Sequence, residues 1–151
     1  MAMHDFGILL GLAYQGFVEA LHAYLAEHGF TAVGTSHGYV VRLLAASPGI
    51  SQRELAKRLA ITEQRAGQIV EDMVRGRFVT RQADPDDARA RVLTLGPRGQ
   101  ELLKLARRFH ATYEKRLARE LGTSIEATRA VLEHIVASSS DETAQGRLRA
   151  T

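Results

Sequence analysis

Apolar residues recur at every third or fourth position over residues 6–28, the spacing of one face of an α-helix. Further apolar residues beside this stripe make it too wide for one neighbouring element to cover. In a small protein the cover is often a second subunit. Gly29 then supplies a helix stop. The residues of the stripe are Leu10, Tyr14, Phe17, Val18, Leu21, Tyr24 and Leu25.

Three more helices are predicted outside the middle of the chain. A short helix precedes the turn Ser-Pro-Gly at residues 47–49. A long helix begins at Pro97, because proline is favoured in a first helical turn, and stops near Gly122. A final helix covers residues 124–136. We expect the tail, 138–151, to be disordered because it contains almost no apolar residues.

The middle of the chain contains two helix starts separated by a short turn. Ser51 begins a capping box, in which its hydroxyl accepts from the backbone N–H of Glu54 while the glutamate reaches back. Thr62 is predicted to cap a second helix over residues 63–75. About three residues separate the two helices, which is the spacing of a helix-turn-helix.

Two strand-like runs follow the second helix. They cover residues 78–82 and 89–95, and the turn-forming sequence Asp-Pro-Asp-Asp at 84–87 lies between them. A helix, a turn, a helix and a β-hairpin in this order make a winged helix. We therefore predict a mainly α (α+β) fold, with a winged helix-turn-helix core at 50–95 and N- and C-terminal helices that form a dimerisation region.

Polar side chains of the second helix suit the reading of DNA bases. Gln64, Arg65 and Gln68 occupy its first two turns. In the major groove glutamine pairs with adenine and arginine pairs with guanine through two hydrogen bonds. The wing carries Arg81, Arg89 and Arg91, and one of these arginines can enter a narrow minor groove, where the negative potential is enhanced.

The distribution of charge supports this division of roles. Twenty Lys and Arg against seventeen Asp and Glu give a net charge of only +3. Residues 1–50 carry −2, however, whereas residues 51–100 carry +3 and residues 101–151 carry +2. This asymmetry indicates one part that faces a polyanion and another that packs on a different surface.

The length and the missing cysteines exclude several classes of protein. The 151 residues fit one domain. Without cysteine there is no disulfide, no thiolate zinc site, no cysteine nucleophile and no thiol redox switch. No uninterrupted run of 18 apolar residues is present, and Asp5 stands where a secretory signal carries basic residues. We expect a cytoplasmic protein that does not bind a membrane.

The stretch ELAKRLAITEQRAGQIVEDMVRGRFVTRQADPDDARARVLTLGPRGQELL resembles the core of the MarR family of bacterial transcriptional regulators. Asp84, Asp87 and Arg89 match the family's wing pattern Asp-x-x-Asp-x-Arg. Gly99 matches the glycine that follows the second wing strand. The resemblance covers residues 35–135, and the order and spacing of the motifs carry it more than any single motif.

Three positions depart from the family pattern. Ala88 stands where the family usually has an arginine beside Arg89, and Gly96 stands where a Leu-Thr pair normally caps the long helix. Arg77 occupies the usual position of a glycine before the first wing strand, with Gly76 one place early. These departures concern the wing contacts rather than the fold.

The resemblance implies a homodimer whose first and last helices interlock and whose recognition helices enter successive major grooves of a pseudo-palindromic operator. A single domain is then expected over 1–137, with 6–46 and 97–137 mainly for dimerisation. The DNA-binding residues expected are Ser51, Gln52, Arg53, Thr62, Gln64, Arg65, Gln68, Arg81, Asp84, Asp87, Arg89 and Arg91. Among them, an aspartate of the wing is expected to hold the Arg89 side chain.

The resemblance also implies a repressor that releases DNA when a small aromatic acid or drug binds between the dimerisation and DNA-binding regions. Aromatic residues at helical spacing are more often part of a core than of such a site. The candidates to line the site are Tyr14, Phe17, His22, His37 and Tyr39.

Metal binding and catalysis find little support in the sequence. Glu19 with His22, and His110 with Glu114, each place two potential ligands on one helical face, short of the three or four that a zinc site needs. No phosphate-binding glycine loop, Gly-x-Ser-x-Gly elbow or His-Glu-x-x-His motif is present. We expect no metal, no cofactor and no enzymatic activity.

The alternative function is a winged helix that serves as a protein–protein interaction module without specific DNA binding. Its acidic residues would then face the protein partner. These residues are Glu71, Asp72, Asp84, Asp86 and Asp87.

Overall fold

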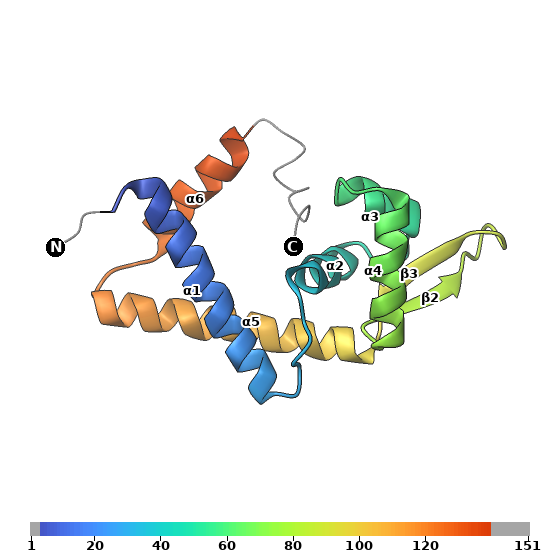
Figure 1. Cartoon of the computed structure of the whole chain (residues 1–151), viewed down its shortest axis with the longest axis horizontal. Coiled ribbons are helices and arrows are strands. Elements are labelled where there is room, and N and C mark those ends of the chain that lie inside the picture. Colours follow the sequence, from blue (N-terminus) through green and yellow to red (C-terminus); the bar gives the residue numbers. More distant parts are fainter. Residues whose placement is uncertain (1–3, 140–151) are drawn as a thin grey trace.

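The computed structural model describes residues 4–139. Figure 1 shows α1, α6 and much of α5 on one side, and α3, α4 and a projecting β2–β3 hairpin on the other. This architecture confirms the predicted mainly helical winged-helix fold. The elements are α1 (Phe6–Glu27), α2 (Thr35–Ala46), β1 (Ile50–Ser51), α3 (Gln52–Arg58), α4 (Glu63–Arg75), β2 (Val79–Ala83), β3 (Arg91–Leu95), α5 (Pro97–Leu121) and α6 (Glu126–Ser138).

Side-chain caps start both helices of the helix-turn-helix. The Ser51 hydroxyl accepts from the backbone N–H of Glu54, and the Thr62 hydroxyl accepts from that of Arg65, each at 3.1 Å. Both predicted caps are confirmed. The Glu54 carboxylate instead accepts from Nε of Arg58 at 2.9 Å, so the expected return bond of the capping box is replaced by an ion pair within the helix.

A short strand, β1, completes a three-stranded antiparallel sheet in the order β1-β3-β2. Ile50 pairs with Leu93, and Val79 pairs with Leu95. The sequence did not predict β1, because two residues are too few to show an alternating pattern. The strand joins the start of α3 to the wing and so fixes the helix-turn-helix against the sheet.

The wing turn is longer than the sequence predicted. The returning strand was expected from residue 89 but begins at Arg91. Residues 84–90 form a loop in which the Asp84 N–H donates to the Ala90 carbonyl at 3.1 Å. The Ala90 N–H in turn donates to the Asp87 carbonyl at 3.0 Å. These bonds close the loop before the strands pair, so Arg89 lies in the turn.

The start of α5 is pressed against the root of the wing. A Cβ added to Gly96 would lie 2.4 Å from the Arg77 carbonyl oxygen, and one added to Gly99 would lie 2.1 Å from that of Phe78. Neither position has room for a side chain. The largest fully buried side chains of the hydrophobic core are Leu44, Leu55, Met73, Leu93, Val40, Val41 and Val70.

Helix α6 begins and ends two residues later than predicted. The Ser124 hydroxyl accepts from the Glu126 N–H at 3.1 Å, so the helix starts after this turn. Ser138 belongs to the helix although it was assigned to the predicted disordered tail. Residues 140–151 of that tail lie outside the described part of the chain.

Two apolar helical faces are uncovered in the single chain. Every residue of α6 is exposed, and the N-terminal half of α1 is nearly as open. Among the described residues α1 is also the one helix long and apolar enough to cross a membrane by length and composition, with a mean hydropathy of 1.2 in its most apolar window. The exposed apolar side chains of the two helices are Phe6, Ile8, Leu9, Leu12, Tyr14, Val131, Leu132, Ile135 and Val136.

Candidate nucleic-acid interface and ligand cavity

A groove of about 750 Å³ runs between α3, α4 and the wing. It brings together seven of the twelve side chains that the sequence predicted for DNA binding. Gly67, Glu71 and Ala90 complete the lining and had not been predicted as DNA contacts. The seven predicted residues are Ser51, Gln52, Arg53, Gln64, Gln68, Arg81 and Arg91.

Gln52 lines this groove where α3 and α4 approach each other. A Cβ added to Gly67 would lie 3.1 Å from Nε2 of Gln52, so the glycine leaves room for the amide between α3 and α4. The Gln52 Oε1 atom accepts from Nη2 of Arg81 at 3.5 Å. The first strand of the wing thus meets the helix-turn-helix through a pair of exposed polar side chains.

Helix α4 presents a polar face that is free of the core. Gln64, Arg65 and Gln68 are exposed, whereas the opposite face is buried. Arg65 is not part of the groove lining, but it lies in the first two turns of α4 with the two glutamines. Residues in these turns are the ones that reach base edges when a recognition helix enters the major groove. The buried residues of the other face are Ala66, Ile69, Val70 and Met73.

Arg53 is held only loosely before any partner binds. Its Nε lies 3.7 Å from the Glu63 carboxylate, and the two side chains are 86% and 69% exposed. Exposed pairs of this kind contribute about 0–1 kcal/mol. The guanidinium can therefore exchange this contact for a phosphate at little cost.

The wing aspartates stabilise the turn rather than the arginine side chain. Asp84 Oδ1 accepts from the backbone N–H of Asp86 at 2.9 Å, and Asp87 Oδ1 accepts from that of Arg89 at 3.0 Å. Among residues 4–139 no ion pair joins Arg89 to either carboxylate. The expectation that an aspartate holds the guanidinium of Arg89 is therefore not met in the unbound chain.

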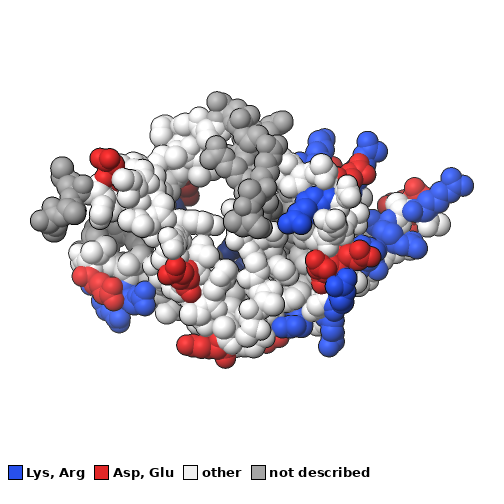
Figure 2. Space-filling model, viewed as in Figure 1, with Lys and Arg blue, Asp and Glu red and all other residues white. Residues whose placement is uncertain are grey.

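Positive charge gathers at the end of the molecule that carries this groove. Figure 2 shows Lys and Arg side chains around α3, α4 and the wing, with acidic side chains between them. The opposite end, over α1 and α6, is mostly white in the same view, with scattered acidic side chains and a small basic cluster at the lower left. The charge asymmetry expected from the sequence is thus visible on this face.

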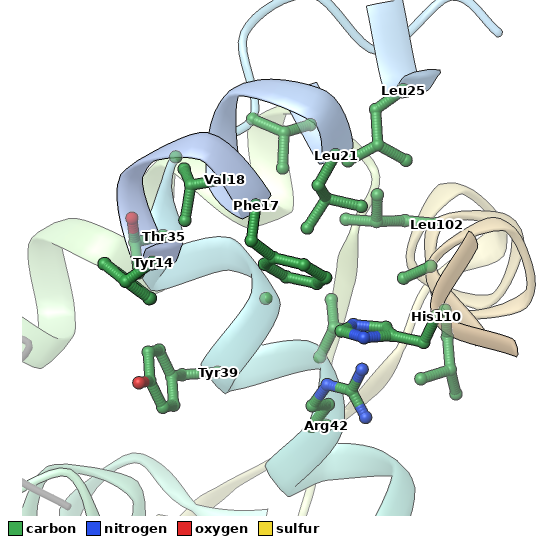
Figure 3. Close-up of a pocket in the computed structure, with 16 residues that line it drawn as sticks. Tyr14, Phe17, Val18, Leu21, Leu25, Thr35, Tyr39, Arg42, Leu102 and His110 are labelled. Carbon is green, nitrogen blue, oxygen red and sulfur yellow. The ribbon is translucent and has the colours of Figure 1, made fainter. Parts of the chain in front are cut away.

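A second feature is an apolar cavity of about 200 Å³ between α1, α2 and α5 (Figure 3). Tyr14, Phe17 and Tyr39 line it as predicted from the sequence. The other two candidates do not. His22 is exposed on α1, and His37 packs its ring at 5.3 Å from that of Phe78.

Two basic side chains that the sequence analysis did not assign to the ligand site lie at one end of the cavity. Figure 3 shows the guanidinium of Arg42 beside the imidazole of His110, with the Phe17 ring next to them. Burial lowers the pKa of His110, the charge of Arg42 lowers it further, and Glu114 opposes the shift. A neutral imidazole beside a guanidinium suits an anionic group of a ligand. Arg42 and His110 are 68 positions apart in the sequence, so no local pattern relates them.

No metal site forms within residues 4–139, where no three His, Asp or Glu side chains come together. Glu114, a potential ligand with His110, pairs instead with Arg129 of α6. His22 lies three residues before Leu25, the buried residue of α1, and is exposed.

A basic winged helix-turn-helix flanked by helices defines a class of DNA-binding regulators. The family model described as "MarR family" matches residues 28–90. This stretch is therefore similar to the MarR family, and the resemblance predicted from the sequence is confirmed. No curated protein matches the chain in sequence.

Solved structures of MarR-type regulators share the fold over nearly the whole chain. The transcriptional repressor CouR, solved with a 23-mer DNA duplex, is 25% identical with a TM-score of 0.64, covering 93% of this chain and 99% of its own. A mutant of S. aureus MepR, solved with an oligodeoxyribonucleotide, is 18% identical with a TM-score of 0.64, covering 90% and 99%. PcaV from Streptomyces coelicolor, solved with its natural ligand, is 20% identical with a TM-score of 0.59, covering 93% and 100%.

Proposed function

We propose that this protein is a cytoplasmic, sequence-specific regulator of transcription that binds double-stranded DNA as a homodimer. The observation that carries the proposal is the groove between α3, α4 and the wing. It gathers glutamine amides and arginine guanidinium groups on one exposed face. Amides and guanidinium groups are the side chains that recognise adenine and guanine in the major groove.

Each part of the surface has a distinct role in this proposal. Gln64, Arg65 and Gln68 read base edges, and Arg89 at the tip of the wing enters the minor groove. Thr62 caps α4 and so fixes the orientation of those three side chains. Asp84 and Asp87 shape the turn that carries Arg89. Phosphate contacts fall to Ser51, Gln52, Arg53, Arg81 and Arg91.

The partner for the uncovered faces of α1 and α6 is a second copy of the chain. Leu132 is 43% exposed and Val136 is 62% exposed, in the middle and at the end of α6. Covering such faces removes apolar surface from water. Residues 6–46 and 97–137 then act mainly in dimerisation and residues 50–95 in DNA binding, within one domain over 1–137. The apolar length of α1 is used in this interface and not in a membrane.

The apolar cavity is the site of a small aromatic acid that regulates DNA binding. Tyr14, Phe17 and Tyr39 supply aromatic walls, and Arg42 with His110 supplies the partner for the acidic group. The cavity lies between α1, α2 and α5, and α2 also packs against strand β3, so the cavity adjoins both the dimerisation region and the winged helix. A ligand there changes the packing of the two regions, which makes the protein a ligand-responsive repressor.

Selection of bound fragments from genomic DNA tests this proposal, repeated with a panel of monocyclic aromatic acids. We expect enrichment of a pseudo-palindromic sequence with half-sites about one helical turn apart. We also expect at least one acid to reduce the enrichment. If no sequence is enriched over random fragments, and the protein instead captures a protein partner through its acidic surface, the interaction module is favoured.

A further inference from the structure

The side chain of Arg98, in the first turn of α5, lies between two aromatic rings from different parts of the fold. Its guanidinium carbon is 4.8 Å from the ring centroid of Phe30 and 4.9 Å from that of Phe78. Both rings are buried. An Arg98 Nη2 atom also donates to the carbonyl oxygen of Gly29 at 3.3 Å. One planar group therefore joins the loop after α1 to the residue before β2.

The backbone of the same turn holds the root of the wing. The Arg98 N–H donates to the Arg77 carbonyl at 3.2 Å, and the Gly96 N–H donates to the Phe78 carbonyl at 2.9 Å. Phe78 directly precedes β2, so its position sets where the first wing strand begins. The Arg98 side chain thus contacts Phe78, and its backbone N–H bonds to Arg77, the residue next to Phe78.

The loop on the other side of Arg98 leads into the wall of the apolar cavity. Val33, Gly34 and Thr35 line that cavity, a few residues after Phe30. His37 makes a second connection, because its Nδ1 accepts from the Gly34 N–H at 3.3 Å while its ring packs on Phe78. The Phe78 ring is consequently contacted from the loop, from α2 and from α5.

We propose that Arg98 is a positioning residue that couples the loop at residues 29–35 to the root of the wing, and thereby sets how the wing meets DNA. The effect of Arg98 on DNA binding rests on the proposed function, whereas the coupling between the loop and the wing does not. The Arg98 guanidinium is held between Phe30 and Phe78 and bonded to Gly29, so it does not contact DNA itself. Its effect on DNA binding is transmitted by the wing.

Hydrogen exchange of the full-length protein in the absence of DNA tests the coupling. Arg98→Met removes the guanidinium but keeps an unbranched side chain. Arg107→Met removes the same charge from an exposed position of α5 and serves as the matched control. We expect Arg98→Met to speed amide exchange in both residues 29–35 and residues 79–95, and Arg107→Met to change neither. If Arg98→Met does not fold, Arg98→Lys replaces it, because lysine keeps the charge without the planar fork.

A double-mutant cycle with Arg89→Ala tests the effect on DNA binding. If Arg89→Ala weakens binding about tenfold in the native background, we expect less than about threefold in the Arg98→Met background, because the wing is already displaced. A full tenfold loss in both backgrounds would show that Arg98 does not act through the wing and would overturn the proposal.

The two measurements separate failure of this inference from failure of the proposed function. A protein that binds no duplex DNA contradicts the proposed function, and hydrogen exchange then decides on the coupling. Faster exchange in only one of the two segments, or the same change with Arg107→Met, overturns the role of Arg98 whether or not DNA binds.

Discussion

The Arg81 guanidinium lies 3.5 Å from the Gln52 side-chain oxygen, so the first wing strand and the start of α3 meet in the groove. Both side chains are accessible, and this bond is at the long limit for a hydrogen bond. It places Arg81 beside α3 without using all its donors. A guanidinium has five N–H donors, which leaves several for a phosphate.

Replacing Arg81 with alanine should weaken binding to all DNA sequences alike. A phosphate contact carries no base information, and its loss should reduce the salt slope of log affinity by about one. Titration of several duplexes at several salt concentrations measures both quantities. Gln82→Ala, one position along the same strand and also exposed, is the control. A loss confined to one base pair would assign Arg81 to base reading instead.

Replacing Arg65 with alanine should have the opposite pattern. If Arg65 pairs with guanine, we expect a loss of about 1–3 kcal/mol that is confined to particular base pairs. Competition with duplexes carrying single base-pair changes measures it. Arg75→Ala, at the last turn of α4 and paired with Asp72, should leave specificity unchanged. Equal weakening on every sequence would make Arg65 a phosphate contact.

A charge on the uncovered face of α6 should dissociate the dimer. Leu132→Glu places a carboxylate where apolar surface is to be buried, which is unfavourable without a partner. Ala130→Glu adds the same charge on another face of the exposed helix and should leave the dimer intact. Sedimentation at several protein concentrations distinguishes the two species. A dimer that persists with Leu132→Glu would remove α6 from the interface.

Two residues with a left-handed backbone should tolerate glycine with a gain in stability. Ala60 has φ 51° in the turn between α3 and α4, and Arg77 has φ 65° before the wing. Because a Cβ makes this conformation costly, Ala60→Gly and Arg77→Gly should each raise the free energy of unfolding by about 0.5–1 kcal/mol. Ala111→Gly, within α5, should lower it by about as much. Urea unfolding measures all three, and a loss of stability in the first two would contradict the reason given.

Stability should decrease as the pH falls below about 6.5. Burial lowers the pKa of His37, against a smaller opposing effect of Asp72, and burial together with Arg42 lowers the pKa of His110. The unfolded chain therefore takes up protons first, and the stability present above the unfolded pKa of 6.5 is lost as the pH falls through the lowered folded values. Urea unfolding between pH 5 and pH 8, compared with His37→Asn, measures this. An equal pH dependence in the variant would exclude His37 as a source.

Local patterns predicted the helix-turn-helix because its signals lie close together in the sequence. Each cap could be predicted from Ser51 or Thr62 and the three residues that follow it. The structure contains both hydrogen bonds from the backbone N–H to the capping hydroxyl. The wing was predicted in outline for the same reason. Its loop was predicted too short because the bonds between Asp84 and Ala90, and between Asp87 and Ala90, depend on the closed turn.

The features that sequence patterns missed depend on contacts between distant segments. Strand β1 exists because Ile50 pairs with Leu93, 43 positions away. Arg42 meets His110 only because α2 packs against α5. His37 was expected to line the ligand site, but its ring packs on Phe78. These pairings arise from the tertiary fold and leave no periodic signal along the chain.

The most direct test of the central claim is the salt dependence of affinity for a duplex selected from genomic DNA. Binding by the predicted arginine surface should release counterions, so log affinity should fall linearly with log salt at a slope of about −0.9 for each phosphate contacted. We predict a slope that corresponds to several contacts per dimer and that becomes shallower in Arg53→Ala and Arg81→Ala. A flat dependence, or equal affinity for the selected duplex and a scrambled one at every salt concentration, would contradict a sequence-specific DNA-binding function.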